Sequence, residues 1–149
     1  MNDDEKWMQI AINESNAAKS EDEIPVGAVI VKNGQLIAKA HNQPVSTNDP
    51  TAHAEIQVIR KAGKKEKNYR LVGTTLYVTL EPCIMCLGAL MHARIERIVF
   101  GAKDTKNGVC GSLVDLTNAS QFNHHTIVTS GVLEKQCQEI LRSFFKLRR

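Results

Sequence analysis

The stretch TTLYVTLEPCIMCLGALMHA, residues 74–93, contains the change of pattern that decides the fold. Residues 74–80 are mostly β-branched, aromatic and aliphatic, which is typical of a strand. Pro82 suits the first helical position, so the residues from 82 to 93 predict a helix that follows the strand directly. Strands that alternate with helices are the building units of α/β proteins, because each helical crossover makes neighbouring strands parallel.

The sequence before this unit predicts a β-hairpin. Two apolar runs in PVGAVIVKNGQLIAKAHN, residues 25–42, flank the dipeptide Asn33-Gly34, which suits the positive φ angles of a type I′ turn. The first run, VGAVIV, is continuous rather than alternating. We therefore expect its strand to be buried on both faces of a sheet.

The other strands and helices follow from similar signals. Short β-branched runs predict strands, whereas capping residues and apolar residues at helical spacing predict helices. The hairpin pair is antiparallel and the later strand–helix–strand units are parallel, so we expect an α/β fold with a mixed sheet of about five strands and helices on both faces. The further elements are an N-terminal helix capped by Asp3 or Asp4, a helix over about 51–61 capped by Asp49 with Pro50 at its first position, strands at 97–102 and 125–129, and a last helix from about Val132.

Length and composition indicate one soluble domain, residues 1–149. The acidic start MNDDEKW lacks the basic and apolar regions of a signal peptide, and no apolar run reaches the roughly 18 residues of a membrane span. We therefore expect a cytoplasmic protein with no membrane partner, in which the four cysteines stay reduced. The formal net charge of +3 permits a nucleic-acid partner without requiring one.

Three residues of types that bind transition metals lie where two of the expected helices begin. His53 is near the start of the helix after the hairpin, and Cys83 and Cys86 are in the first turn of the helix after strand 74–80. If the strands before these helices are parallel, both helix starts lie at the same edge of the sheet, where open α/β sheets place their sites. The topology thus allows the three side chains to meet.

The ligand types favour zinc, and their number favours a catalytic site over a structural one. Histidine and cysteine thiolate are common zinc ligands, and a helix N-terminus favours the thiolate form. A structural zinc site takes a fourth protein ligand from a second C-x-x-C or an H-x₃₋₅-H pair, which this sequence lacks. Three ligands leave a position for a water molecule, and Glu55, two residues after His53, is the nearest acidic residue that could take its proton.

Each of these features also has a plainer explanation. A C-x-x-C pair alone is also found in thioredoxin-like redox sites, although the accompanying H-A-E sequence argues against that here. Cys110 and Cys137 are expected to be inert, small apolar residues, and His41 and His92 to be satisfied core residues. The basic stretch 60–70 is as easily a solvated surface as a contact with RNA.

The combination of H-A-E at 53–55 with P-C-I-M-C at 82–86 is the signature H-x-E…P-C-x-x-C of zinc-dependent deaminases, in which the Glu transfers protons and is not a zinc ligand. The similarity extends over nearly the whole chain and is more specific than the zinc motif, which free-nucleoside deaminases share. The segments that resemble the bacterial tRNA-specific adenosine deaminases, within the cytidine and deoxycytidylate deaminase superfamily, are HNQPVSTNDPTAHAEI (41–56), NYRLVGTTLYVTLEPCIMC (68–86), IVFGAKD (98–104) and GSLVDL (111–116).

This resemblance implies a three-layer α/β/α cytidine deaminase-like fold, one Zn²⁺ per subunit and a homodimer. It implies a tRNA-editing hydrolase that deaminates adenosine to inosine at the wobble position of the anticodon, mainly of tRNA-Arg. In this chemistry a zinc-activated water attacks C6 of adenine. His53, Cys83 and Cys86 would hold the metal, and Glu55 would deliver a proton to N1 of the base.

Three further residues are assigned to substrate binding. Asn42 resembles a base-contacting asparagine of the family, and Asp104 resembles a loop residue that contacts nucleotides beside the target, although it could equally be a turn residue. Phe145 is a better candidate than Phe144 for stacking on RNA, because the helical spacing of Phe144 places it in the core. The expected partner is the tRNA anticodon stem-loop, since bases in a single-stranded loop are easily extruded.

Two other functions stay open. A deaminase of a free base or nucleoside, such as guanine or cytidine, would carry the same zinc site. A zinc-dependent binding module without catalysis is less well matched, because a purely structural site has no use for an open coordination position beside Glu55.

Overall fold

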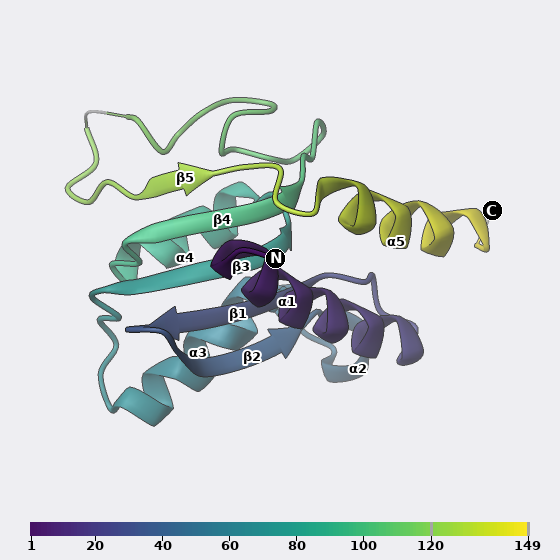
Figure 1. The fold of residues 1–149 in the computed structure, drawn as a ribbon, viewed down its shortest axis with the longest axis horizontal. Coiled ribbons are helices and arrows are strands. Elements are labelled where there is room, and N and C mark those ends of the chain that lie inside the picture. Colours follow the sequence, from purple (N-terminus) through teal and green to yellow (C-terminus); the bar gives the residue numbers. More distant parts are fainter. Residues whose placement is uncertain (120, 149) are drawn as a thin grey trace.

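The computed structural model describes residues 1–119 and 121–148 of the chain. These residues form a five-stranded sheet in the spatial order β2-β1-β3-β4-β5 (Figure 1). The number of strands therefore agrees with the prediction. The strands are β1 (Gly27–Lys32), β2 (Gln35–His41), β3 (Thr74–Leu80), β4 (Arg97–Ala102) and β5 (Ile127–Thr129).

The sheet is mixed, as predicted, because one strand runs against the other four. β1 pairs antiparallel with both β2 and β3, whereas the pairs β3–β4 and β4–β5 are parallel. β2 and β3 consequently run in the same direction, although β1 separates them. Their C-terminal ends lie at the same edge of the sheet, which is the condition for His53 to approach Cys83 and Cys86.

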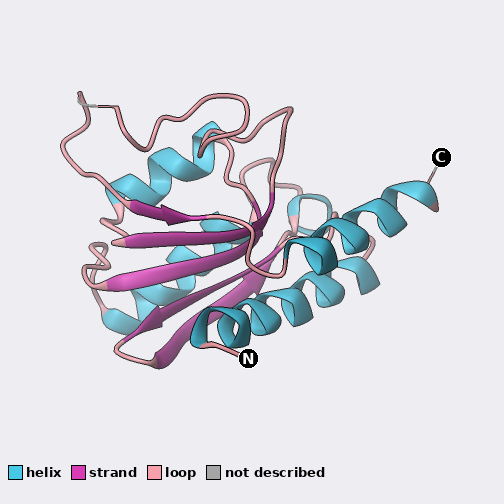
Figure 2. Cartoon of the chain, turned by 45° about the horizontal axis from the view of Figure 1, so that its top comes forward, coloured by secondary structure: helices cyan, strands magenta, loops and turns pink. Residues whose placement is uncertain are grey.

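Helices cover both faces of the sheet and produce the three-layer α/β/α architecture (Figure 1 and Figure 2). α1 and α5 pack on one face, where Met8 and Cys137 join Val29 and Val99 in a buried cluster. α3 and α4 pack on the other face, around Leu76 and other apolar residues of the central strands. The helices are α1 (Asp3–Ser20), α2 (Pro44–Thr47), α3 (Ala54–Glu66), α4 (Ile84–His92) and α5 (Glu134–Lys146).

The hairpin and the packing of the last helix follow local sequence closely. Asn33 and Gly34 have φ angles of 52° and 72°, as a type I′ turn requires. The strand before them is buried on both faces except at its last residue, which confirms the prediction from its continuous apolar run. On the α5 side, a Cβ atom at Gly101 would lie 2.3 Å from Sγ of Cys137. Cys137 therefore serves to pack α5 closely against β4.

Helix α3 begins later than predicted. Asp49, the expected cap, instead accepts hydrogen bonds from the backbone N–H and the hydroxyl of Thr51, at 2.8 and 2.7 Å, and so stabilises a local turn. The helix starts at Ala54 with His53 as its N-cap, and the unexpected short helix α2 precedes this turn. His53 therefore has extended backbone angles and lies just outside the helix.

The starts of three other helices also differ from the prediction by one or two residues, and one of these is α5, which begins at Glu134 rather than near Val132. Asn2, not Asp3 or Asp4, caps α1: its side chain accepts from the backbone N–H of Glu5 at 2.8 Å, and Glu5 bonds back to the Asn2 backbone. Cys83 is the N-cap of α4, so Pro82 lies before the helix rather than in its first turn. Within the described residues, no helix has the length and apolarity needed to cross a membrane.

Candidate active site

His53, Cys83 and Cys86 meet at one edge of the sheet, as the topology allows. His53 is the N-cap of α3, in the connection after β2, and Cys83 is the N-cap of α4, directly after β3. Cys86 lies in the first turn of α4 and is buried, whereas the other two are half-buried. One ligand atom from each residue lies within 4.8 Å of the other two, and the described residues contain no other such cluster of three.

The distances fit a tetrahedral zinc ion held by two thiolates and one imidazole. Nδ1 of His53 lies 3.7 Å from Sγ of Cys83 and 3.4 Å from Sγ of Cys86. With Zn–S and Zn–N bonds of about 2.3 and 2.1 Å, a tetrahedral angle separates the N and S atoms by ~3.6 Å. The side chains are therefore spaced for the ion, with three protein ligands rather than four.

The pKa values of the two thiols of this cluster are shifted in opposite directions. A hydrogen bond from the Cys86 thiol, with a further one from His53, lowers the pKa of Cys83 to about 4. The same Cys83–Cys86 bond, together with burial, raises the pKa of Cys86. The hydrogen bond with Cys83 also raises the pKa of His53. The lowered pKa of Cys83 favours its thiolate, which is the form that binds metal, and metal binding would displace the protons that the cluster holds.

Glu55 is buried beside these three residues but is not one of the clustered ligands. It is the second residue of α3, is 4% exposed, and lines the same cavity as His53 and Cys83. Burial raises the pKa of Glu55 to about 7, which suits a group that takes up and releases a proton near neutrality. Residues two apart within a helix point in nearly opposite directions. His53 and Glu55 share a cavity because His53 precedes the helix.

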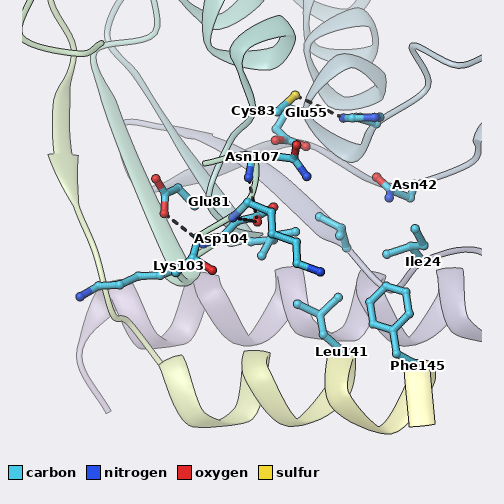
Figure 3. A pocket seen from close by; sticks show the side chains of 15 residues that line it. Ile24, Asn42, Glu55, Glu81, Cys83, Lys103, Asp104, Asn107, Leu141 and Phe145 are labelled. Atoms are coloured by element: carbon cyan, nitrogen blue, oxygen red, sulfur yellow. Dashed lines mark hydrogen bonds between the residues drawn. The ribbon is translucent and has the colours of Figure 1, made fainter. Parts of the chain in front are cut away.

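The cavity in front of the cluster has a volume of about 710 Å³, within the range of small-molecule sites. Figure 3 shows Cys83 and Glu55 at one end and, at the other, Leu141 and Phe145 projecting from α5. Phe144 is 3% exposed and Phe145 is 42% exposed. The prediction that Phe144 belongs to the core is therefore confirmed, and Phe145 is placed where a substrate could contact it.

Asn42 lies directly after β2 and is oriented by the start of α3. Its Oδ1 accepts a hydrogen bond of 2.7 Å from the backbone N–H of Ala54. A backbone N–H can only donate, so the atom that faces it is the carboxamide oxygen. The NH₂ group of Asn42 is then left for the cavity, which this residue lines. The arrangement offers a fixed hydrogen-bond donor to a bound molecule.

Asp104 has a turn role that the structure displays directly. Its Oδ1 accepts hydrogen bonds from the backbone N–H groups of Lys106 and Asn107, both at 3.1 Å. These bonds shape the loop after β4, in agreement with the turn interpretation. Asp104 also lines the cavity, and Lys103 and Lys106 are exposed on the same loop. A role in contacting substrate thus stays a prediction that this placement permits.

The remaining expectations have mixed outcomes. Cys110, like Cys137, is buried and lies outside the metal-binding cluster. His41 bonds to the carboxylates of Glu14 and Glu21, so it is satisfied as expected, but it is half-buried rather than in the core. The predicted core position of His92 is wrong, because this last residue of α4 is exposed. The basic stretch 60–70 occupies the C-terminal half of α3 and the following loop, at the end of the helix opposite His53.

One cavity residue, Glu81, was not singled out from the sequence. It lies between β3 and Cys83 and is 2% exposed. The sequence feature that could have identified it is a charged residue placed directly between a buried strand and the metal ligand Cys83. Such a residue is either solvated or, if buried, bound by several hydrogen-bond donors.

Comparisons with known proteins agree with this geometry. Residues 1–102 match the family model of the cytidine and deoxycytidylate deaminase zinc-binding region. The tRNA-specific adenosine deaminase of Bacillus subtilis (strain 168) is 48% identical over 146 residues, which cover 98% of this chain and 91% of that protein. The protein of the same name from Haemophilus influenzae is 48% identical over 147 residues, which cover 98% of this chain and 85% of that protein.

Solved structures give the same result. One solved structure comes from biochemical and structural studies of A-to-I editing by tRNA:A34 deaminases at the wobble position of transfer RNA. It matches this chain with a TM-score of 0.88 and 44% identity, and the match covers 91% of this chain and 99% of the other. The guanine deaminase of Bacillus subtilis matches with a TM-score of 0.66 and 42% identity, and the match covers 70% of this chain and 67% of that one. The chain therefore belongs to the cytidine and deoxycytidylate deaminase family and, within it, to the tRNA-specific adenosine deaminases.

Proposed function

We propose that this protein edits tRNA by converting adenosine to inosine at the wobble position of the anticodon, with tRNA-Arg as its main substrate. The observation that carries the proposal is the convergence of His53, Cys83 and Cys86 at a cavity that His53, Cys83 and the buried carboxylate of Glu55 line. The substrate class comes from the relatives named tRNA-specific adenosine deaminases and from the structural neighbour studied as a tRNA:A34 deaminase.

The reaction exchanges the amino group at C6 of adenine for the oxygen of water and releases ammonia. Zinc, held by His53, Cys83 and Cys86, supplies when bound a water molecule whose pKa is lowered to about 7. Glu55, with its pKa raised to about 7 by burial, is matched to hold the proton taken from that water. From the same position it delivers a proton to N1 of the base and assists the departure of the amine.

Asn42, Asp104 and Phe145 bind and orient the extruded nucleotide in this proposal. The NH₂ group of Asn42, fixed by its bond to Ala54, donates to a ring nitrogen of the purine. The exposed ring of Phe145 stacks on a base beside the target, and Asp104 contacts a neighbouring nucleotide. A base in the anticodon loop is already partly unstacked, so its extrusion into the cavity is inexpensive.

We also propose that the protein acts as a homodimer in the cytoplasm, where tRNA is processed. Two apolar side chains that a second copy could cover are Ile84 at the start of α4, which is 67% exposed, and Leu113 in the loop that follows β4, which is 57% exposed. Light scattering on the purified protein should give twice the 16.5 kDa of one chain. A mass of one chain at micromolar concentration would contradict the dimer.

A second candidate is deamination of a free base, which the similarity to the guanine deaminase of Bacillus subtilis favours. One experiment separates the two. The zinc-loaded protein is incubated in parallel with an unmodified tRNA-Arg anticodon stem-loop, with guanine and with cytidine, and the products inosine, xanthine and uridine are measured. We expect inosine in the stem-loop. Xanthine or uridine without inosine would overturn the proposal.

A further inference from the structure

Glu81 is a buried carboxylate between the end of β3 and the zinc-binding turn, residues 82–86, which contains Cys83 and Cys86. The residue is 2% exposed, and its backbone N–H donates to the carbonyl of Ala102 at the end of β4. None of the ion pairs among the described residues includes Glu81. A buried charge with no cation beside it must be satisfied by hydrogen-bond donors, or it strongly destabilises the fold.

The donors that satisfy this carboxylate all come from the loop after β4, residues 103–112. Oε1 accepts from the backbone N–H of Asp104 at 3.1 Å and from the hydroxyl of Ser112. Oε2 accepts from the backbone N–H groups of Cys110 at 2.9 Å and of Ser112 at 3.1 Å. One side chain therefore holds both ends of the 103–112 loop, and Figure 3 shows it beside Asp104.

The 103–112 loop forms one wall of the cavity. Its residues 103–107 all line the space in front of the metal ligands. A further bond runs from the backbone N–H of Val109 to the carbonyl of Pro82 at 3.1 Å, so the loop is also tied to the residue before Cys83. The distance between this wall and the zinc-binding turn is consequently set by Glu81 and Pro82.

Gly108 shows how closely the loop approaches the carboxylate. A Cβ atom at this position would lie 2.4 Å from Cδ of Glu81 and 2.5 Å from the carbonyl oxygen of Asp104. Neither distance is possible without displacing the loop. The backbone of the loop thus lies directly against the side chain of Glu81, and glycine is required there.

We propose that Glu81 is a positioning residue of the enzyme: its carboxylate holds the 103–112 loop in place, and with it the cavity wall that receives the RNA. The inference rests on the proposed function for the identity of the substrate. The attachment of the loop can be tested without any substrate. Glu81 acts through the loop rather than on the base, because both of its oxygens accept hydrogen bonds from that loop.

Hydrogen exchange on the zinc-loaded protein tests the attachment directly. In Glu81→Gln the shape is nearly kept, but an NH₂ group replaces one acceptor and faces N–H donors. Loss of hydrogen bonds to a charged group shifts the local equilibrium by roughly ten- to a hundredfold. We expect the amides of Asp104, Cys110 and Ser112 to exchange at least about tenfold faster, while the amides of β3 keep their wild-type rates.

Further variants separate this effect from a general loss of stability. In Gly108→Ala the added Cβ atom pushes the loop away from an unchanged Glu81. This variant should show the same faster exchange of the loop amides, even if Glu81→Gln fails to fold. Ser112→Ala removes one of the four hydrogen bonds and should have a smaller effect. Asp4→Asn, which breaks a bidentate pair with Arg97 at the other edge of the sheet, should leave the loop amides protected.

Kinetics on the anticodon stem-loop complete the test. Glu81→Gln should raise KM by about tenfold, change kcat by less than about threefold, and keep one zinc per chain. If the wild-type protein forms no inosine, the proposed function fails, while hydrogen exchange still decides the role of Glu81. Wild-type exchange in both Glu81→Gln and Gly108→Ala would overturn the proposal, and so would loss of zinc or a fall in kcat at unchanged KM.

Discussion

Replacing Asn42 by aspartate tests how the base is oriented in the cavity. The substitution turns the NH₂ group into an oxygen but keeps an oxygen towards Ala54, so the 2.7 Å bond that orients the side chain is retained. The N-terminus of α3 stabilises a negative charge at this position. We therefore expect Asn42→Asp to fold and bind zinc as the wild-type protein does, while it presents an acceptor where the base requires a donor.

The size of the effect follows from these contacts. A lost hydrogen bond to a neutral group costs about 0.5–1.5 kcal/mol, and two facing acceptors add repulsion, so kcat/KM should fall roughly ten- to a hundredfold. Asn42→Ala should give a similar loss of activity. It should also lower the free energy of unfolding by about 1–3 kcal/mol, because the N–H of Ala54 loses its partner at a buried position.

The assay is inosine formation in the anticodon stem-loop at several substrate concentrations, together with thermal unfolding of both variants. A wild-type kcat/KM for Asn42→Asp would show that the NH₂ group does not contact the base. If Asn42→Asp were as unstable as Asn42→Ala, the assignment of the oxygen towards Ala54 would be refuted.

Three other predictions concern stability, stacking and the metal. Asp4→Asn should lower the free energy of unfolding at pH 7 by roughly 1–3 kcal/mol, since the bidentate bond with Arg97 is lost. That bond lowers the pKa of Asp4 below its ordinary value of 3.8. In urea titrations, the difference in unfolding free energy between the wild-type protein and Asp4→Asn should therefore be complete above pH 3.8 and disappear as the pH falls further. Phe145→Ala should raise KM for the stem-loop several-fold with little change in Tm, whereas Phe144→Ala should cost ~3 kcal/mol of stability in the same unfolding assay. Cys86→Ala should lose zinc and activity together, as metal analysis and the inosine assay would show.

The metal cluster could be anticipated because it depends on strand direction, which the sequence encodes locally for the hairpin and the strand–helix units. Asn33-Gly34 reverses the chain, so β2 runs antiparallel to β1. The pairing of β1 with β3, between residues more than 40 positions apart, sets β2 in the direction of β3, and this pairing could only be assumed from the sequence. The positions of Cys83 and Cys86 then follow from the strand–helix boundary at residues 80–84. The meeting of His53 with both thiols therefore depends on these short-range features and on the long-range pairing of β1 with β3.

The features that escaped prediction depend on bonds between distant parts of the chain. The four bonds to Glu81 come from donors 23 to 31 residues away, in a loop with no regular structure. Asp4 and Arg97 are 93 residues apart. The start of α3 was misplaced for a local reason, since Asp49 resembles a cap but bonds to Thr51 instead.

The central claim is that Glu55 moves protons beside a zinc ion that it does not bind. Glu55→Gln tests it most directly, because the amide keeps the shape of the side chain and cannot transfer a proton in its place. Zinc content and inosine formation are measured on the same preparation, next to the wild-type protein. We expect one zinc per chain and a kcat lower by about 10²- to 10⁴-fold. Loss of the metal, or a kcat close to that of the wild-type protein, would contradict the claim.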